Sequence, residues 1–217
     1  MAELHHLLAD RWSPRSFVGT HTMSEDEVDS LLDAARWAPS AADSQPCRFV
    51  VGHRDDETHK RIFANLAPAD QRWAGRAAVL IVAARLRFGR TDAALPYADY
   101  DLGQAVAHLT VQAMALGLHV RQVVDIDAAG LRADLDLPDD MTPRTVTAVG
   151  MVGDPAQLPA DLRDREVRLR RRRPLAELLL GRDRARLAEP DPQVGAARGE
   201  DRADWFRARL PQFMMIT

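Results

Sequence analysis

Residues 34–49 read AARWAPSAADSQPCRF and hold the end of a helix, a polar turn and the start of a strand. Upstream, Ser24 is followed three residues later by Glu27, the spacing of a capping box that begins a helix. Apolar residues then recur at helical spacing until Pro39 ends the helix, because the residue before a proline avoids the helical conformation. Downstream, residues 48–52 predict a strand. The stretch therefore indicates a fold that mixes helices and strands.

The same reading extends along the chain. Residues 78–84 are apolar at successive positions, which predicts a strand in the centre of a sheet. Gly117 follows the longest predicted helix and suits the left-handed position beyond a helix end. Further strands are predicted at 120–126 and 145–152, and helices at 4–8, 57–66, 101–116, 128–135 and 174–180, the last as a helix of the core.

The composition is that of a globular protein with one well-filled domain and an appendage. The chain has 217 residues, of which 46% are apolar and 28% charged. Its sole cysteine, Cys47, excludes an intramolecular disulfide and a cysteine-based zinc site, and favours a reducing, cytoplasmic location. The apolar stretch at 77–84 is too short to span a bilayer. We therefore expect neither secretion nor membrane insertion.

The charge balance and the histidines exclude several other partners. The 29 basic and 32 acidic residues give a net charge of −3, which offers no general attraction for nucleic acid. The histidines have no metal-ligand spacing with acidic residues or cysteine, so we expect no metal site. The motifs of dinucleotide-binding folds, P-loops and serine hydrolases are also absent. If the protein binds an anion, a local group of basic residues must therefore recognise it, because the overall charge does not attract it.

Two arginine-containing stretches are candidates for such local recognition. The first is residues 11–15, RWSPR, and the second is residues 168–173, RLRRRR. Guanidinium groups bind phosphate oxygens bidentately, and a serine hydroxyl can complete the contact. The alternative for each stretch is a solvated basic surface, since arginine is used throughout this chain.

Four segments, taken in order, resemble the FMN-dependent nitroreductases. Residues 11–17 are similar to that family's N-terminal Arg-x-Ser-x-Arg/Lys-x-Phe motif, and 34–49 to its Ala-Pro-Ser-x-x-Asn-x-Gln-Pro-Trp-x-Phe segment. Residues 101–118 resemble its central dimer-interface helix, and 170–175 its closing basic-x-Arg-x-Pro-Leu motif. Asp43 stands where the family has Asn, which changes the hydrogen-bond polarity there. Cys47 stands where the family has Trp, which changes packing.

The resemblance implies an α+β three-layer fold with a central, mostly antiparallel sheet flanked by helices, in an intertwined homodimer. Two FMN sites at the dimer interface would each be shared between subunits. Arg11, Ser13, Arg170 and Arg172 would hold the FMN phosphate, and Arg15 would lie near the flavin pyrimidine, where a cation stabilises reduced flavin. The full set of implied cofactor-binding residues is Arg11, Trp12, Ser13, Arg15, Pro39, Ser40, Ala41, Asp43, Val124, Asp125, Arg170 and Arg172.

The implied activity is oxidation of NADH or NADPH through FMN and reduction of a nitroaromatic, a quinone or an activated alkene. No side chain would act as acid or base, because the hydride chemistry belongs to the flavin. One alternative is a specialised flavoenzyme of the same fold, either a reductive dehalogenase or a flavin-consuming oxygenase. A second alternative is a non-catalytic flavin-binding protein. The choice between NADH and NADPH stays open.

Aromatic residues indicate where a substrate pocket and a C-terminal extension lie. Tyr97, Tyr100, Trp205 and Phe206 could stack on a planar acceptor, or they could pack an interface between subunits. We expect residues 1–181 to form the FMN-binding domain. Residues 182–217 would form an extension that packs on the partner subunit, because its large apolar side chains are costly to leave in water. The alternative is a surface extension folded on its own subunit.

Overall fold

The computed structural model describes residues 4–89 and 93–179 of the chain. It divides into two compact units, one that ends at Gly153 and one that begins at Asp154. The first unit contains the sheet and the candidate site.

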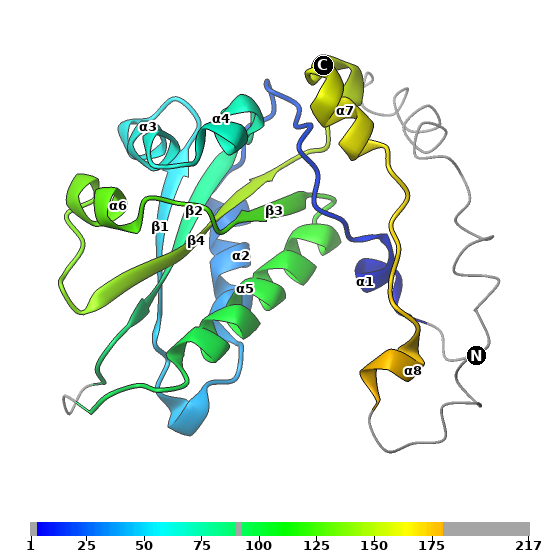
Figure 1. The fold of residues 1–217 in the computed structure, drawn as a ribbon. Coiled ribbons are helices and arrows are strands. Elements are labelled where there is room, and N and C mark those ends of the chain that lie inside the picture. The colour runs from blue at the N-terminus through cyan, green and yellow to red at the C-terminus, as the bar shows by residue number, and fades with distance from the viewer. Residues whose placement is uncertain (1–3, 90–92, 180–217) are drawn as a thin grey trace. The chain divides into compact units, whose positions relative to one another are not determined.

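The centre of the first unit is a four-stranded antiparallel sheet with the order β1-β2-β4-β3 (Figure 1). β2 lies inside the sheet and is buried along most of its length, which confirms the central strand expected from its continuous apolar run. The four strands are β1 (Cys47–His53), β2 (Val79–Leu86), β3 (His119–Val123) and β4 (Met141–Gly150).

All four strands differ slightly from the prediction at their ends, and two of them differ by three or more residues at one end. β3 ends at Val123 rather than at residue 126, because the chain leaves the sheet and Ile126 instead forms an isolated bridge with Leu66. β4 begins at Met141, earlier than the predicted residue 145, and includes Pro143. The pairing of β2 with β4 shifts register beside this proline, and such an irregularity accommodates a residue that has no amide hydrogen.

One face of the sheet is covered by α2 (Glu25–Arg36) and α5 (Ala98–Ala115). The predicted capping box of α2 is present: the amide of Glu27 donates to Oγ of Ser24 at 3.3 Å, and the amide of Ser24 donates to Oε2 of Glu27 at 2.8 Å. The glycine at the end of α5 has a φ of 74°, as its predicted left-handed role requires. The core between the helices and the sheet is closed by Val28, Leu31, Ala35, Val79, Ile81, Ala105, Leu109, Ala113, Val120 and Val149.

The remaining helices of the first unit are short. α3 packs on β1 and β2, and α6 packs on β4, which gives the three layers implied by the resemblance (Figure 1). α3 approaches β1 so closely that a Cβ on Gly52 would lie 2.5 Å from the backbone N of His59. The helix α4 was not predicted, although Pro68 at its first turn is a usual starting signal. These helices are α1 (His6–Asp10), α3 (Glu57–Ala64), α4 (Pro68–Ala74) and α6 (Ala128–Asp134).

The described part of the second unit contains η2 (Pro155–Gln157), α7 (Ala160–Glu166) and α8 (Leu175–Leu178). The prediction of a core helix at 174–180 is wrong for the described residues: α8 is a single turn, and Leu175 and Leu178 are exposed. So short a segment gains little from helix propensity and needs apolar packing to form a longer helix. α7 was not predicted.

Candidate functional site

The segment between α2 and β1 has an unusual backbone. Ala42, Asp43 and Gln45 adopt positive φ angles of 51°, 54° and 46°, whereas the described residues contain only two other non-glycine examples, Asp55 and Asp136. Left-handed conformations are costly for residues with a Cβ and persist where the surroundings enforce them. The segment includes the short helix η1 (Ala41–Asp43) and four of the predicted cofactor-binding residues.

Hydrogen bonds hold this segment from inside and from outside. Within it, the amide of Gln45 donates to Oγ of Ser40 at 3.0 Å, and Nε2 of Gln45 donates to Oδ1 of Asp43 at 2.7 Å. From outside, the amide of Ala41 donates to Oδ2 of Asp101 at 3.2 Å. Asp101 lies in the first turn of α5 and is only 2% exposed. A buried carboxylate therefore fixes the start of the left-handed stretch.

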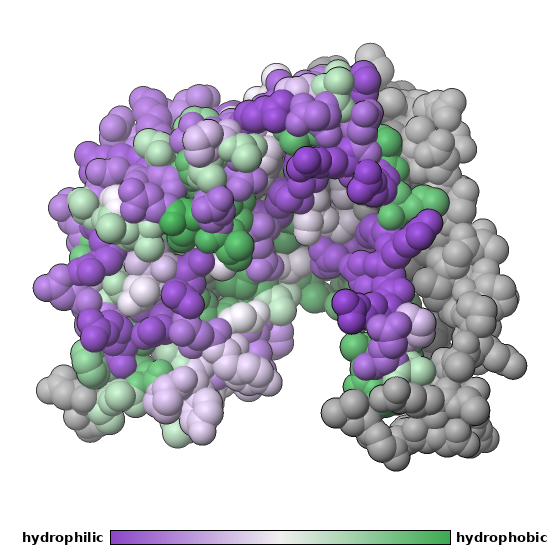
Figure 2. Space-filling view, in the orientation of Figure 1, coloured by the Kyte–Doolittle hydropathy of each residue, from purple (hydrophilic) through white to green (hydrophobic). Residues whose placement is uncertain are grey.

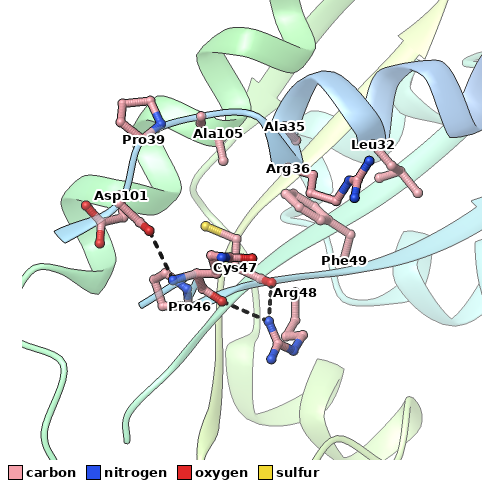
Figure 3. Close-up of a pocket in the computed structure, with 13 residues that line it drawn as sticks. Leu32, Ala35, Arg36, Pro39, Pro46, Cys47, Arg48, Phe49, Asp101 and Ala105 are labelled. Atoms are coloured by element: carbon pink, nitrogen blue, oxygen red, sulfur yellow. Dashed lines mark hydrogen bonds between the residues drawn. The ribbon is translucent and has the colours of Figure 1, made fainter. Parts of the chain in front are cut away.

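A pocket of about 350 Å³ lies beside this segment, between α2, α5 and β1. In Figure 3, Cys47 lies near its middle, with Asp101 on one side and Phe49 on the other. Burial raises the pKa of the Cys47 thiol to about 11, and the charge of Asp101 adds to the increase. The wall is mainly apolar, with arginines at two positions; it is formed by Leu32, Ala35, Arg36, Ala38, Pro39, Ser40, Gln45, Pro46, Cys47, Arg48, Phe49, Asp101 and Ala105.

A second group of predicted residues lies around the start of β3. Nη1 of Arg11 donates to Oγ of Ser13 at 3.2 Å, so a guanidinium and a hydroxyl lie side by side. Trp12, between them in sequence, is buried and contacts His119 edge-on, with 6.1 Å between ring centroids. Nη1 of Arg121 donates to the carbonyl oxygen of Ser13 at 2.9 Å. Two residues of β3 therefore anchor the predicted phosphate-binding stretch.

Val124 and Asp125 follow directly at the other end of β3. At about 3.3 Å per residue, Val124 lies roughly 10 Å along the strand from Arg121. Val124 is exposed, and the carbonyl oxygen of Asp125 accepts a hydrogen bond from the amide of Ala67 at 3.3 Å. The predicted contacts for the phosphate and for the flavin ring thus lie along a single strand.

The two groups lie at opposite ends of α5. The segment that contains Ala41 is bonded to Asp101 at the N-terminal end of this helix, whereas Trp12 contacts His119, just beyond its C-terminal end. The helix has 18 residues and is about 27 Å long at 1.5 Å per residue. One subunit therefore does not bring its two groups of predicted residues together around one ligand.

The two tyrosines of the predicted substrate pocket lie at the same end of α5 as the Ala41 segment. Tyr97 is 63% and Tyr100 is 70% exposed. Between them, Asp99 forms ion pairs with Nε of Arg85 at 3.1 Å and with Nε of Arg144 at 2.9 Å. The beginning of α5 is thus tied to β2 and β4 while both phenol rings face outward.

Several predicted residues belong to the second unit or lie outside the described chain. Arg170 and Arg172 are exposed in the second unit, and Nη1 of Arg172 donates to the carbonyl oxygen of Arg171 at 3.0 Å. Trp205, Phe206 and the rest of the predicted extension 182–217 lie outside the described residues. Within the described residues, no group of three potential metal ligands is found and no helix is both long and apolar enough to cross a membrane.

The sequence reading did not select Asp101 or Arg121 as site residues. Asp101 precedes Ala105 by one helical turn, and Ala105 precedes Leu109 by another, so helical spacing places the carboxylate on the buried face. This signal could have identified it as a buried charge in need of a partner. Arg121 alternates with buried Val120 along a strand, and nothing in that pattern marks it.

Comparison with known proteins decides the family. A family model described as the nitroreductase family matches residues 8–153. The chain belongs to the nitroreductase family. The resemblance inferred from the four segments, together with its α+β fold, is confirmed.

Individual proteins that are similar to this nitroreductase-family chain support the same family assignment. A crystal structure of an oxidoreductase containing FMN is 34% identical, with a TM-score of 0.78 over 83% of this chain and 93% of that chain. A Desulfovibrio desulfuricans protein described as a nitroreductase in complex with FMN is 29% identical, with a TM-score of 0.66 over 84% and 99% of the two chains. An uncharacterized 15.4 kDa protein of Mycolicibacterium smegmatis is 30% identical over 60% of this chain and 92% of its own length.

Proposed function

We propose that this protein is an FMN-dependent NAD(P)H oxidoreductase that works as a homodimer. The observation that supports this most directly is the separation of the two groups of predicted cofactor-binding residues by the length of α5. A cofactor that needs both groups can obtain them from two copies of the chain. The FMN in two related crystal structures supports the choice of cofactor.

Residues around β3 would bind the phosphate and one edge of the flavin. The neighbouring guanidinium of Arg11 and hydroxyl of Ser13 match the donors that a phosphate requires. The guanidinium would donate a charge-assisted hydrogen bond to a phosphate oxygen, and the hydroxyl would donate a neutral one. Arg170 and Arg172 would add cationic donors. Arg15 would lie near the flavin pyrimidine, and the backbone at Val124 and Asp125 would face the centre of the ring.

The partner subunit would supply Pro39, Ser40, Ala41 and Asp43 against the flavin. The segment that contains them includes the left-handed residues Ala42, Asp43 and Gln45 and is held by the bond to Asp101 and by bonds within the segment. A segment ordered before binding loses less conformational entropy when the cofactor arrives. The strain is therefore consistent with a surface that is shaped in advance for a rigid ring, as FMN presents.

Bound FMN would supply the hydride chemistry, taking a hydride from NADH or NADPH and passing reducing equivalents to an acceptor. The role of the chain is to bind and orient the cofactor and the two substrates. The acceptor class is a nitroaromatic, a quinone or an activated alkene. Tyr97 and Tyr100, exposed at the same end of α5 as the Ala41 segment, would stack on a planar acceptor.

The exposed face of α5 supports self-association. Its exposed positions include the small residues Gly103, Ala107 and Ala115, whereas buried residues line the opposite face. In Figure 2, pale and green residues follow the region of α5. Small residues on an exposed helix face allow a second copy of the same helix to approach closely.

The C-terminal extension has a place in the same proposal. Residues 182–217 would form an arm on the partner subunit, with Trp205 and Phe206 at the entrance of the substrate pocket. Residues 1–181 would form the FMN-binding domain. The proposed location is the cytoplasm, on the basis of the single cysteine.

The deciding experiment is the absorption spectrum of the purified protein, followed by anaerobic titration with NADH and NADPH. We expect a yellow protein that releases FMN on denaturation and is bleached by at least one of the nucleotides. Subsequent addition of a quinone or a nitroaromatic should restore the oxidised spectrum. Release of FAD, or a colourless protein that excess FMN cannot reconstitute, would contradict the proposal.

Product analysis separates the alternatives. Steady NAD(P)H oxidation in the presence of a quinone supports the oxidoreductase. A bound flavin that no nucleotide reduces would favour a non-catalytic flavin-binding protein. Loss of halide from the substrate, or consumption of the flavin with oxygen, would favour a specialised flavoenzyme.

A further inference from the structure

The contact between Asp101 and Ala41 joins residues that are 60 positions apart in the sequence. Asp101 is almost completely buried, and burying a carboxylate is expensive unless it is hydrogen-bonded. Its position in the first turn of α5 offsets part of that cost, because the N-terminal end of a helix favours negative charge. An apolar residue at this position would avoid the cost altogether, so the carboxylate requires an explanation beyond packing.

Asp101 contacts the segment from Ser40 to Gln45, whose backbone conformation needs to be held in place by contacts with the rest of the protein. Ala42, Asp43 and Gln45 are all left-handed, and in isolation such residues relax to the ordinary regions of backbone space. The bonds from Gln45 to Ser40 and to Asp43 close the segment on itself but do not attach it to the core. The bond from Ala41 attaches the N-terminal side of the segment to α5.

We propose that Asp101 is a positioning residue that holds the segment from Ser40 to Gln45, with its three left-handed residues, in place and thereby sets the affinity for FMN. The effect on FMN rests on the proposed function. The effect on the segment does not, because it concerns only the backbone of this chain. Asp101 itself need not touch the cofactor.

The charge of Asp101 acts on a second residue of the pocket, Cys47. The Cys47 thiol lines the same pocket, and its pKa is raised first by burial and second by the negative charge of Asp101. Asp101→Asn keeps an oxygen that can accept the amide of Ala41 but removes the charge. Asp101→Ala removes both. The two variants therefore separate the hydrogen bond from the charge.

The test uses the full chain and three measurements. The first is amide hydrogen exchange at Ala41 by NMR without added FMN, the second is the Kd for FMN, and the third is the pH dependence of Cys47 alkylation. The control is Thr110→Val, which removes the bond from Thr110 to the carbonyl oxygen of Val106 on the same helix without touching the segment. Melting temperatures of all variants are recorded.

We expect Asp101→Ala to speed exchange at Ala41 and to raise the Kd for FMN by about 10-fold or more, as loss of a bond to a charged acceptor implies. Asp101→Asn should stay within a few fold of the wild type in both. Both variants should shift the alkylation profile of Cys47 to lower pH. Thr110→Val should lower the melting temperature and leave all three readouts unchanged.

Two results would overturn the positioning role. One is unchanged exchange at Ala41 in Asp101→Ala. The other is a Kd for FMN that follows the melting temperature equally in Asp101→Ala and Thr110→Val, since that would be a general loss of stability. Failure of the wild-type protein to bind FMN would instead reject the proposed function, and exchange at Ala41 would still decide whether Asp101 holds the segment.

Discussion

The indole of Trp12 packs edge-on against the imidazole of His119, with 6.1 Å between the ring centroids. His119 begins β3, directly after the turn that ends α5, so this contact fixes the N-terminal segment at that end of the helix. Trp12 is 6% exposed, whereas its neighbours Arg11 and Ser13 are more accessible. A buried ring thus orients two polar side chains toward the surface.

Replacement of this ring tests how much of the fold depends on it. Trp12→Ala should lower the free energy of unfolding by about 3 to 5 kcal/mol, the range for removal of a large buried aromatic side chain. Trp37→Ala is the matched control, because Trp37 is 77% exposed. Its effect should stay within about 0.5 kcal/mol. Urea denaturation followed by circular dichroism measures both, and equal losses would contradict the assigned burial.

The basic run of the second unit offers a test of the phosphate contacts. Arg172→Ala should weaken FMN binding by about 10- to 100-fold, as expected for loss of a charge-assisted bond to phosphate. Arg171→Ala, a neighbouring exposed arginine, should change the Kd much less. Fluorescence titration of the flavin gives both constants. The opposite ranking would show that the motif has been aligned in the wrong register.

Self-association should depend on the exposed face of α5. Ala107→Glu places a charge on that face and should produce monomers at micromolar concentration, because an unpaired buried charge opposes association. Ala133→Glu introduces the same side chain at an exposed position of α6 and should leave the dimer intact. Light scattering coupled to gel filtration distinguishes the species. A dimer that persists in Ala107→Glu would place the interface elsewhere.

Stability should fall on the acidic side of neutrality because of two histidines, the buried His59 and the half-buried His21. Burial lowers the pKa of His59 and of His21, so the unfolded chain binds protons that the folded chain does not. Their contribution to stability is complete above 6.5, the ordinary pKa of histidine in the unfolded chain, and is lost as the pH falls from there through the lower pKa of the folded state. The melting temperature should therefore fall as the pH drops below about 6.5.

The control for this prediction is a comparison of histidine variants. A double variant with His59→Gln and His21→Gln should show a flatter dependence of melting temperature on pH. His6→Gln, which alters an exposed histidine of α1, should keep the dependence of the wild type. If the double variant retains the full slope, other groups carry the acid sensitivity.

Local signals predicted most of the fold. The Ser24–Glu27 spacing located the start of α2, the apolar run at 78–84 located the central strand, and Gly117 marked the end of α5. The two errors have different causes. β3 stops early because a tertiary contact, the bridge between Ile126 and Leu66, overrides the local preference, whereas α8 remains a single turn because its exposed leucines lack the apolar packing that a longer helix needs.

The site was predictable in its residue types and not in its geometry. The four motifs supplied the candidates, yet no motif states that Ala41 is bonded to Asp101, or that Ser13 is bonded to Arg121. Both bonds join positions far apart in the chain, and only the folded structure brings them together. The sequence also does not show that the two groups of predicted residues lie at opposite ends of α5, because this depends on the direction in which the helix crosses the sheet.

The placement of the two half-sites at opposite ends of α5 has a genetic consequence. In the proposed homodimer, a chain with Arg11→Ala is damaged at one end and a chain with Asp101→Ala at the other. When the two are produced together, a mixed dimer combines both lesions in one site and leaves the other site wholly unaltered. Two alleles that fail separately should therefore complement each other in trans, and the mixed protein should regain up to half of the flavin of the wild type.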